Sequence, residues 1–259
     1  MRARRDDDYH ELETLFAFVA DGDTVTLSDG AGFAVDGPFA GALAGEGDNL
    51  VTRAAAEFAQ AFGIEVAGRI TLTKRLPVAS GLGGGSADAA ATLRLLARHE
   101  GIALDDPRLF DCADALGSDV PACLYSRTAI GRGRGERLEP MAGAPGTPVL
   151  LVNPGVAVST AAVFARWDGK DRGALGEGEV LAVAVTGRND LEPPALAIAP
   201  EIGAVLALLG AQSGVSLARM SGSGATCFAL FGDAATRDRA AAAVRQAQPG
   251  WWCLETVLL

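Results

Sequence analysis

Paired cysteines, long apolar runs and an excess of positive charge are all missing from this sequence. The four cysteines, at positions 112, 123, 227 and 253, form no CxxC pair. This argues against a disulfide framework or a zinc site and favours a reducing, cytoplasmic setting. No apolar run approaches the roughly 20 residues that span a bilayer. Only two histidines are present, which gives little basis for a histidine-rich metal site.

The balance of charge excludes another class of partner. The chain has 22 Lys and Arg against 32 Asp and Glu, a net charge of −10. Such a field repels nucleic acid and anionic membranes unless a local patch overrides it. We therefore expect small-molecule partners, no nucleic acid and no membrane, and a monomer or a weak dimer.

The sequence is rich in apolar residues and in unevenly placed glycine. Hydrophobic residues make up 49% of the 259 residues and charged residues 21%, which excludes a disordered chain, a coiled coil or a collagen. At roughly 150 residues per domain, the length predicts one or two domains. The 33 glycines concentrate at 81–85, 131–135 and 222–224, where tight backbone approaches are expected.

Apolar periodicity and punctuation residues predict the secondary structure. In the first part of the chain we expect strands at 15–19 and 24–27 around a turn at 21–23, a helix at 50–62, a strand at 69–75, helices at 86–98 and 107–116, and a glycine-broken strand at 129–138. In the second part we expect strands at 149–152, 226–231 and 252–258, and helices at 159–167, 201–209 and 234–246. Strands and helices mix without strict alternation, which predicts an α+β fold in two lobes. The Gly/Pro/Ala stretch at 142–148 is the best boundary, giving lobes of 1–145 and 146–259.

A glycine loop separates the strand at 69–75 from the helix that follows. It contains Pro77, Val78, Ala79, Ser80, Gly81, Leu82, Gly83, Gly84, Gly85, Ser86 and Ala87. Glycines expose main-chain N–H groups, and the helix adds the positive end of its dipole, so the segment predicts an anion site, most naturally for phosphate. Ser86 is expected to cap the helix and is also placed to reach a phosphate or Mg²⁺. The alternative is a turn that allows tight helix–sheet packing.

The loop differs from three common phosphate motifs. A Walker A loop requires a lysine after its glycines, a dinucleotide fingerprint needs glycine where Ser86 stands, and a protein-kinase loop joins two strands instead of opening a helix. The segment from Pro77 to Ala87 resembles the second motif of the GHMP kinase superfamily, which holds the phosphates of ATP. The turn Ser221-Gly222-Ser223-Gly224-Ala225 resembles the third motif, although alone it is as readily an ordinary β-turn.

Further blocks narrow the resemblance. They occur in order at 7–14 (DDYHELET), 48–50 (DNL), 116–121 (LGSDVP) and 189–191 (NDL). They are similar to the superfamily members that phosphorylate the 2-hydroxyl of a cytidine-diphospho sugar alcohol in the non-mevalonate isoprenoid pathway. The similarity runs from about residue 4 to the C-terminus. It implies an ATP- and Mg²⁺-dependent kinase whose N-terminal lobe is like ribosomal protein S5 domain 2 and whose C-terminal lobe is ferredoxin-like.

The resemblance places the catalytic carboxylate at Asp119, just after the expected helix end at Gly117. A carboxylate there would orient the acceptor alcohol and take its proton. The alternative is a turn aspartate that bonds its own backbone. Asn49 has two readings, a cap of the helix at 50–62 and a contact with adenine.

The remaining candidates concern the second substrate. The resemblance assigns Tyr9 and His10 to the cytosine, where an aromatic face stacks and an imidazole bonds the base edge; the alternative is a surface pair at a strand edge. Thr160 and Phe164 lie in a segment that resembles a substrate-lining segment of the family. The alternative is that both residues belong to the core face of a helix. The turn residues Gly222, Ser223 and Gly224 complete the substrate set implied by the third motif.

The chain departs from the family pattern before Tyr9. The family has a strand there that contains Ala-Lys-Ile-Asn-Leu, and neither Lys74 nor Lys170, the two lysines of this sequence, matches its lysine. Asp8 also stands where the family has glycine. We therefore keep two alternatives beside this kinase: another GHMP small-molecule kinase, and a catalytically impaired nucleotide-binding homologue.

Overall fold

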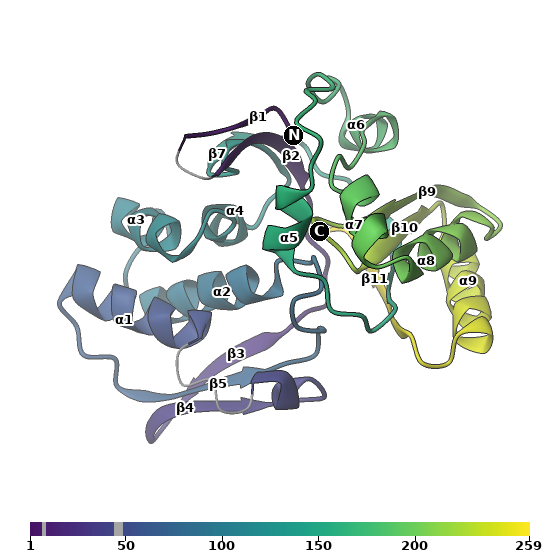
Figure 1. Cartoon of the computed structure of the whole chain (residues 1–259). Helices are drawn as coiled ribbons and strands as arrows, with labels where there is room; N and C mark the ends of the chain where they lie inside the picture. Colours follow the sequence, from purple (N-terminus) through teal and green to yellow (C-terminus); the bar gives the residue numbers. More distant parts are fainter. Residues whose placement is uncertain (7–8, 44–48) are drawn as a thin grey trace. The chain divides into compact units, whose positions relative to one another are not determined.

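The computed structural model describes residues 1–6, 9–43 and 49–259, and the chain forms two compact units (Figure 1). The first unit contains Met1–Asp21, Ala79–Leu82 and Arg127–Leu259, and the second contains Gly22–Val78 and Gly83–Ser126. Both units are discontinuous in sequence, whereas the expected lobes 1–145 and 146–259 are continuous, and that boundary remains a prediction. Asp7, Asp8 and Asp48 of the sequence blocks lie outside the described residues.

The second unit packs helices against a three-stranded sheet. The strand order is β3-β5-β4, with β3 antiparallel and β4 parallel to β5. Val51 of α1 packs on Ile70 and Leu72 of β5, and α2 lies beside α1 (Figure 1). The described elements of this unit are β3 (Thr24–Ser28), β4 (Ala31–Asp36), η1 (Ala40–Leu43), α1 (Leu50–Phe62), β5 (Gly68–Thr73), α2 (Gly84–His99), α3 (Pro107–Leu116) and α4 (Val120–Tyr125).

One sheet of the first unit joins the start of the chain to its middle. Its order is β1-β2-β6-β7, and all neighbours are antiparallel. Leu15 of β2 pairs with Ile130 of β6, so the strand that carries His10 is fixed by a partner more than a hundred residues away. The strands are β1 (Ala3–Arg4), β2 (His10–Phe16), β6 (Ala129–Gly133) and β7 (Arg137–Pro140).

The other sheet of the first unit is ferredoxin-like. Its antiparallel order, β11-β8-β10-β9, places the first and third strands of a β-α-β-β-α-β unit in the centre. Leu150 and Val152 of β8 and Ile202 of α8 share the main core of this unit. The elements are β8 (Pro148–Asn153), α5 (Thr160–Ala165), α6 (Val180–Thr186), α7 (Glu192–Ile198), α8 (Glu201–Gly210), β9 (Val215–Met220), β10 (Cys227–Phe231), α9 (Ala234–Ala247) and β11 (Trp252–Val257).

The observed elements confirm most of the predicted ones. Asn49 caps α1, Asp106 caps α3, and Gly117 ends α3. The first strand begins earlier than expected, at His10, and the glycine-broken strand is a hairpin of β6 and β7. Seven described elements were not predicted from the sequence: β1, β4, η1, α4, α6, α7 and β9.

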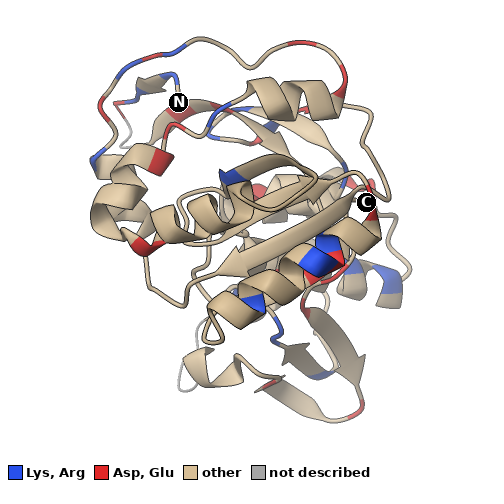
Figure 2. Cartoon of the chain, turned by 90° about the vertical axis from the view of Figure 1, so that its right-hand side faces the viewer, with Lys and Arg blue, Asp and Glu red and all other residues tan. Residues whose placement is uncertain are grey.

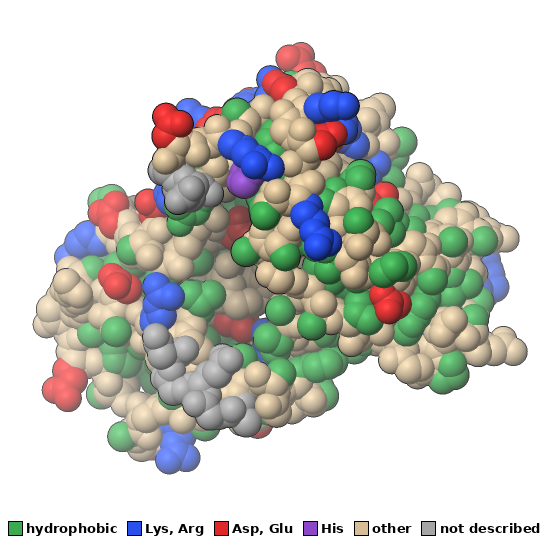
Figure 3. Space-filling view, viewed as in Figure 1, with side chains coloured by type: hydrophobic (Ala, Val, Ile, Leu, Met, Phe, Trp, Pro, Cys, Tyr) green, Lys and Arg blue, Asp and Glu red, His purple; other side chains and the backbone are tan. Residues whose placement is uncertain are grey.

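Charged residues of both signs are interspersed along the ribbon (Figure 2) and over the face shown in Figure 3. The arginines of the β6–β7 hairpin pair with carboxylates, Arg132 with Glu13 and Arg137 with Glu11. Within the described residues, no helix combines the length and the apolarity needed to cross a membrane.

Candidate active site

The glycine loop opens directly into helix α2 of the second unit. The N-cap is Gly83, with a left-handed φ of 67°, and no side chain caps the helix. The expectation that Ser86 is the cap was therefore wrong: the helix begins two residues earlier, because glycine adopts the left-handed conformation at little cost. Ser86 lies in the first turn instead. With no side chain bonded to them, the first N–H groups of α2 stay available to an anion.

The tip of the glycine loop belongs to the first unit and meets the other glycine turn there. A Cβ on Gly81, whose φ is +79°, would lie 2.6 Å from the carbonyl oxygens of both Ser221 and Gly224. A Cβ on Gly222 would lie 2.9 Å from the Gly81 oxygen. Only glycine therefore allows the two turns to approach backbone to backbone. Both turns are recognisable from the sequence separately, but their contact is not.

Hydrogen bonds fix the two turns to each other and to their surroundings. The Ser221 hydroxyl donates to the Gly81 oxygen (2.8 Å), and the Thr226 N–H donates to the Ser80 oxygen (3.0 Å). Asn189 donates from Nδ2 to the oxygens of Met220 (2.9 Å) and Gly222 (2.8 Å). Asn189, the asparagine of the NDL block, thus fixes the backbone of the second glycine turn through two hydrogen bonds.

Thr160 and Ser223, both predicted to contact substrate, lie together in the first unit. Their hydroxyl oxygens are 2.9 Å apart. Thr160 is the first residue of α5, which Ser159 caps, so the helix start and the glycine turn present two hydroxyls side by side. The hydroxyl pair makes the N-terminal end of α5 polar, and Phe164 lies further along the same helix.

The other loop residues differ in exposure. Ser80 is buried, whereas Val78 and Ala79 are exposed. Leu82 packs against the apolar cluster that contains Val149 and Leu151. Gly84, Gly85 and Ala87 lie in the first turn of α2 with Ser86, and Pro77 is half-buried ahead of the tip.

Asp119 stands on the predicted turn, and the unpredicted helix α4 begins directly after it. The residue is the N-cap of α4, yet its side chain makes no cap hydrogen bond, which argues against the alternative that it bonds its own backbone. The side chain stays exposed to solvent, while partial burial by the surrounding protein raises the pKa of its carboxyl. A carboxylate in that state is available to an incoming hydroxyl.

Helix α4 packs on α2, and their charged groups share one neighbour. Burial, followed by the Asp119 charge, raises the pKa of the Cys123 thiol to about 12, and Asp88 of α2 acts on it in the same direction. Arg94 of α2 donates to the Cys123 oxygen at 2.6 Å. Asp119 and Asp88 thus act on the same thiol, that of Cys123.

A buried ion cluster, absent from the sequence-based candidates, lies beside the start of α2. We call Asp23, Lys74 and Asp88 the lysine cluster. Lys74 Nζ is 2.5 Å from Asp23 Oδ2 and 2.8 Å from Asp88 Oδ2. Burial first, opposed by Lys74 and reinforced by Asp23, raises the pKa of Asp88 to about 6. Its signal in the sequence is strand alternation, which puts Lys74 on the same buried face as Ile70 and Leu72.

His10 lies in an aromatic cluster with Phe164 and Trp167. Its ring centroid is 5.1 Å from that of Phe164 and 5.8 Å from that of Trp167, nearly edge-on to the latter. His10 Nε2 and Trp167 Nε1 are buried, and neither has a hydrogen-bond partner among the described residues. The structure thus brings together His10 and Phe164, two predicted site residues, and adds Trp167, which sequence reasoning missed.

Two neighbours flank the aromatic cluster. Tyr9 is half exposed, and the Arg134 guanidinium lies 5.0 Å from the centre of its ring. Arg4 of β1 donates to the oxygens of Trp167 (2.8 Å) and Ala165 (3.2 Å), which ties the N-terminal strand to the end of α5. Burial, and then the Arg4 charge, lower the pKa of His10, so its imidazole is neutral at pH 7.

Asn49 is the cap that the sequence predicted. Its Oδ1 accepts from the N–H groups of Val51 (2.9 Å) and Thr52 (3.1 Å), and the Thr52 hydroxyl completes a capping box. The predicted contact with adenine is a separate role, and it stays a prediction.

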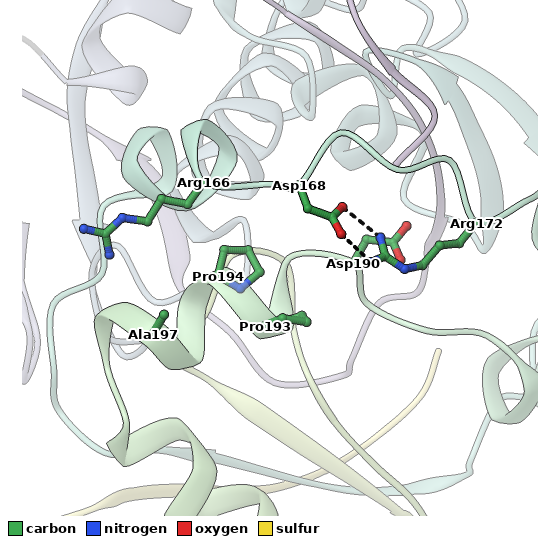
Figure 4. A pocket seen from close by; sticks show the side chains of 7 residues that line it. All are labelled: Arg166, Asp168, Arg172, Asp190, Pro193, Pro194 and Ala197. Atoms are coloured by element: carbon green, nitrogen blue, oxygen red, sulfur yellow. Dashed lines mark hydrogen bonds and ion pairs between the residues drawn. The ribbon is translucent and has the colours of Figure 1, made fainter.

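A cavity of about 390 Å³ lies in the first unit, and its described lining contains none of the candidate site residues. Its described lining is Arg166, Asp168, Arg172, Asp190, Pro193, Pro194 and Ala197. Figure 4 shows Asp168 bonded to Arg172 and the Arg166 side chain extending away from that pair. The charges of Asp168 and Arg172 thus compensate each other, and the cavity adds no candidate residue to the active site.

Two family models match the chain. The model described as GHMP kinases N terminal domain matches residues 49–127, which include the start of α2 and Asp119. The model described as GHMP kinases C terminal matches residues 172–250, which include the second glycine turn. Both glycine turns thus fall within matched segments, residues 81–85 in the first and residues 221–225 in the second.

Curated proteins match over the whole chain. One from Rhizorhabdus wittichii, named 4-diphosphocytidyl-2-C-methyl-D-erythritol kinase, is 56% identical over 263 residues, covering 100% of this chain and 90% of that protein. Another of the same name, from Methylorubrum extorquens, is 49% identical and covers 98% of this chain and 92% of its own.

Solved structures agree with these matches. A crystal structure of 4-(cytidine 5'-diphospho)-2C-methyl-D-erythritol kinase is 35% identical, has a TM-score of 0.77, and covers 99% of this chain and 93% of its own. Homoserine kinase from Cytophaga hutchinsonii, 19% identical with a TM-score of 0.70, covers 94% and 89% and shares the fold. The chain is a kinase that belongs to the GHMP family and, within it, to the 4-diphosphocytidyl-2-C-methyl-D-erythritol kinases.

Proposed function

We propose that the chain transfers the γ-phosphoryl group of ATP to the 2-hydroxyl of 4-diphosphocytidyl-2-C-methyl-D-erythritol, in the cytoplasm and as a monomer or weak dimer. The observation that carries this proposal is the uncapped start of α2. Gly83 offers no capping side chain, so the first N–H groups and the positive helix end receive the β- and γ-phosphates. A Cβ on Gly84 would lie 3.2 Å from Lys74 Nζ and one on Gly85 would lie 3.3 Å from the Leu50 side chain, so glycine at both positions lets the start of α2 pack closely.

Asp119 supplies the carboxylate for the acceptor. It orients the hydroxyl and accepts its proton as the phosphoryl group is transferred. Its lack of a capping bond and its contact with solvent support this role. The Ser86 hydroxyl, in the first turn of α2, is a suitable oxygen donor to Mg²⁺. Mg²⁺, carried on the phosphates of ATP, would neutralise part of the charge that develops there.

The aromatic cluster supplies base recognition. Tyr9 and Phe164 offer faces for stacking, and His10 has a ring nitrogen whose bonding capacity is unused among the described residues. A cytosine edge offers both hydrogen-bond donors and acceptors, which suits a neutral imidazole. The hydroxyls of Thr160 and Ser223, together with Gly222 and Gly224, provide a polar lining for the rest of the substrate.

The test is product formation with purified protein, ATP, Mg²⁺ and the cytidine-diphospho sugar alcohol. We expect ADP to form in proportion to phosphorylated alcohol. Nucleotide binding without turnover would support the impaired homologue instead. Competition by cytidine diphosphate separates this substrate class from those of other GHMP kinases, which have no cytidine to recognise.

A further inference from the structure

We propose that Lys74 is a positioning residue for the phosphate donor, holding both ends of the glycine loop at a fixed separation through Asp23 and Asp88. This inference deepens the proposed function and rests on its assignment of the start of α2 to the phosphates of ATP. Lys74 does not touch the phosphates in this role. It acts through the backbone that binds them.

The lysine cluster is bonded to the end of the loop that follows β5. Asp23 Oδ1 accepts from the N–H groups of Arg75 (2.5 Å) and Leu76 (2.9 Å), while Asp23 Oδ2 binds Lys74 Nζ. One carboxylate thus fixes the last three residues before Pro77. Because Asp23 directly precedes β3 and Lys74 directly follows β5, the bond closes the edge of the paired strands β3 and β5.

The same ammonium group reaches the other end of the loop. A Cβ on Gly84, the first residue of α2, would lie 3.2 Å from Lys74 Nζ. Asp88, one turn further along α2, binds Nζ at 2.8 Å. A single buried cation therefore links the strand end before the loop to the first turn of the helix after it. All of these groups belong to the second unit.

The charge of the cluster shows how it acts. The exposed fractions of the three side chains are only 4% for Lys74, 2% for Asp23 and 6% for Asp88. With both carboxylates ionised the cluster carries a net charge of −1, which would weaken phosphate binding if charge were its only effect. A buried pair broken on one side leaves an uncompensated charge, so the geometry is strongly maintained. The cluster thus serves the phosphates by ordering the N–H groups, not by attracting the anion.

Asp88→Asn distinguishes these two effects, because it removes a negative charge and keeps the shape of the side chain. We expect the KM for ATP to rise at least tenfold, the KM for the cytidine substrate to change less than twofold, and amide hydrogen exchange at 84–87 to accelerate. Lys74→Met should act in the same direction more strongly. The matched control is Thr92→Val, one turn further along α2, which removes the buried hydroxyl bond to the Asp88 oxygen and leaves the cluster intact; it should lower Tm and leave both KM values within twofold.

An unchanged or lower KM for ATP in Asp88→Asn, with unchanged exchange at 84–87, would overturn the inference. Asp88→Asn decides the question even if Lys74→Met does not fold. Failure of the wild-type protein to bind ATP at all would contradict the proposed function instead, so direct nucleotide titration of the wild type accompanies the kinetics.

Discussion

Asp88 and Asp119 are both raised in pKa by burial, and both belong to the packed pair of helices α2 and α4. Their surroundings differ. Asp88 binds Lys74 inside a closed cluster, whereas the Asp119 side chain makes no cap bond and stays in contact with solvent. A polar group whose bonding capacity is used within the protein holds structure, and one whose capacity is unused is free to act on a ligand. His10, with its unpartnered Nε2, belongs with Asp119. Gly81, which packs against the other glycine turn, and Asn49, whose side chain caps α1, hold structure as Asp88 does.

The strongest test of this contrast is Asp119→Asn. We expect kcat to fall by about 10²- to 10⁴-fold, the usual range for loss of a general base, with little change in Tm because the Asp119 side chain makes no cap hydrogen bond to α4. Since desolvation by the surrounding protein raises the pKa of Asp119 above its ordinary value, wild-type kcat should decline on acidification at a higher pH than an aspartate of ordinary pKa would give. The control is Asp111→Asn on the exposed side of α3. A Tm loss of several degrees in Asp119→Asn with normal kcat would show that Asp119 holds structure and does not act on the substrate.

Gly81→Ala tests a residue that holds structure. Its Cβ would press on two backbone oxygens at 2.6 Å, and the left-handed conformation adds about 1–2 kcal/mol. We expect unfolding in urea to show a loss of roughly 3 kcal/mol or more, at the upper end of single substitutions. Gly83→Ala has a similar positive φ but no atom within 4 Å of its Cβ, so it should lose only the conformational part. Equal losses at the two positions would show that the contact between the glycine turns is not tight.

His10→Ala should affect one substrate only. Losing the imidazole from the aromatic cluster should raise the KM for the cytidine substrate about tenfold, which corresponds to about 1.4 kcal/mol, and leave the KM for ATP unchanged. His99→Ala is the matched control, since this second histidine lies exposed at the end of α2. An equal rise in both KM values would assign His10 to general stability.

The same residue predicts a pH effect on stability. The pKa of His10 is lowered in the folded chain, so the unfolded chain binds a proton more readily. The contribution of neutral His10 to the free energy of unfolding is therefore present at neutral pH. It is lost as the pH falls below about 6.5, the pKa of histidine in the unfolded chain. Urea unfolding at pH 7.5 and pH 5.5 should show a smaller difference for His10→Ala than for wild type. Identical differences would mean that His10 is not buried in solution.

Asn49→Ala should have the smallest effect. Loss of the cap is expected to cost about 1 kcal/mol, measured as the free energy of unfolding in urea. Thr52→Ala removes the other half of the capping box, and the double variant should lose less than the sum of the two. A rise in the KM for ATP beyond that of Thr52→Ala would add the predicted adenine contact to the structural role.

Local signals in the sequence were enough for the caps and the amphipathic helices. Asn49 and Asp106 were identified because their side chains bond N–H groups two or three residues away, and such bonds depend on nearby residues alone. The resemblance gave the fold of both lobes. The turn at 21–23 was expected between two strands, but nothing local states that β2 pairs with β6 and β3 with β5.

The missed features all depend on distant partners. The lysine cluster joins residues 51 positions apart in sequence, and Trp167 meets His10 across a still longer stretch. Helix α4 was overlooked because it has only six residues, with Pro121 in its first turn. The Ser86 cap was wrong because a side-chain rule was applied where glycine backbone freedom decides the start of the helix.

The split of the first unit across the sequence has a consequence during synthesis. Every described strand of the second unit lies between residues 24 and 73, and its last described helix ends at Tyr125, so this unit can close while the ribosome is still translating the rest. Strand β2 must wait for β6, and β8 gains its outer neighbour only when Trp252–Val257 emerges. Nascent chains halted just after Tyr125 has left the ribosome should therefore resist protease over their interior while their leading segment is still cut.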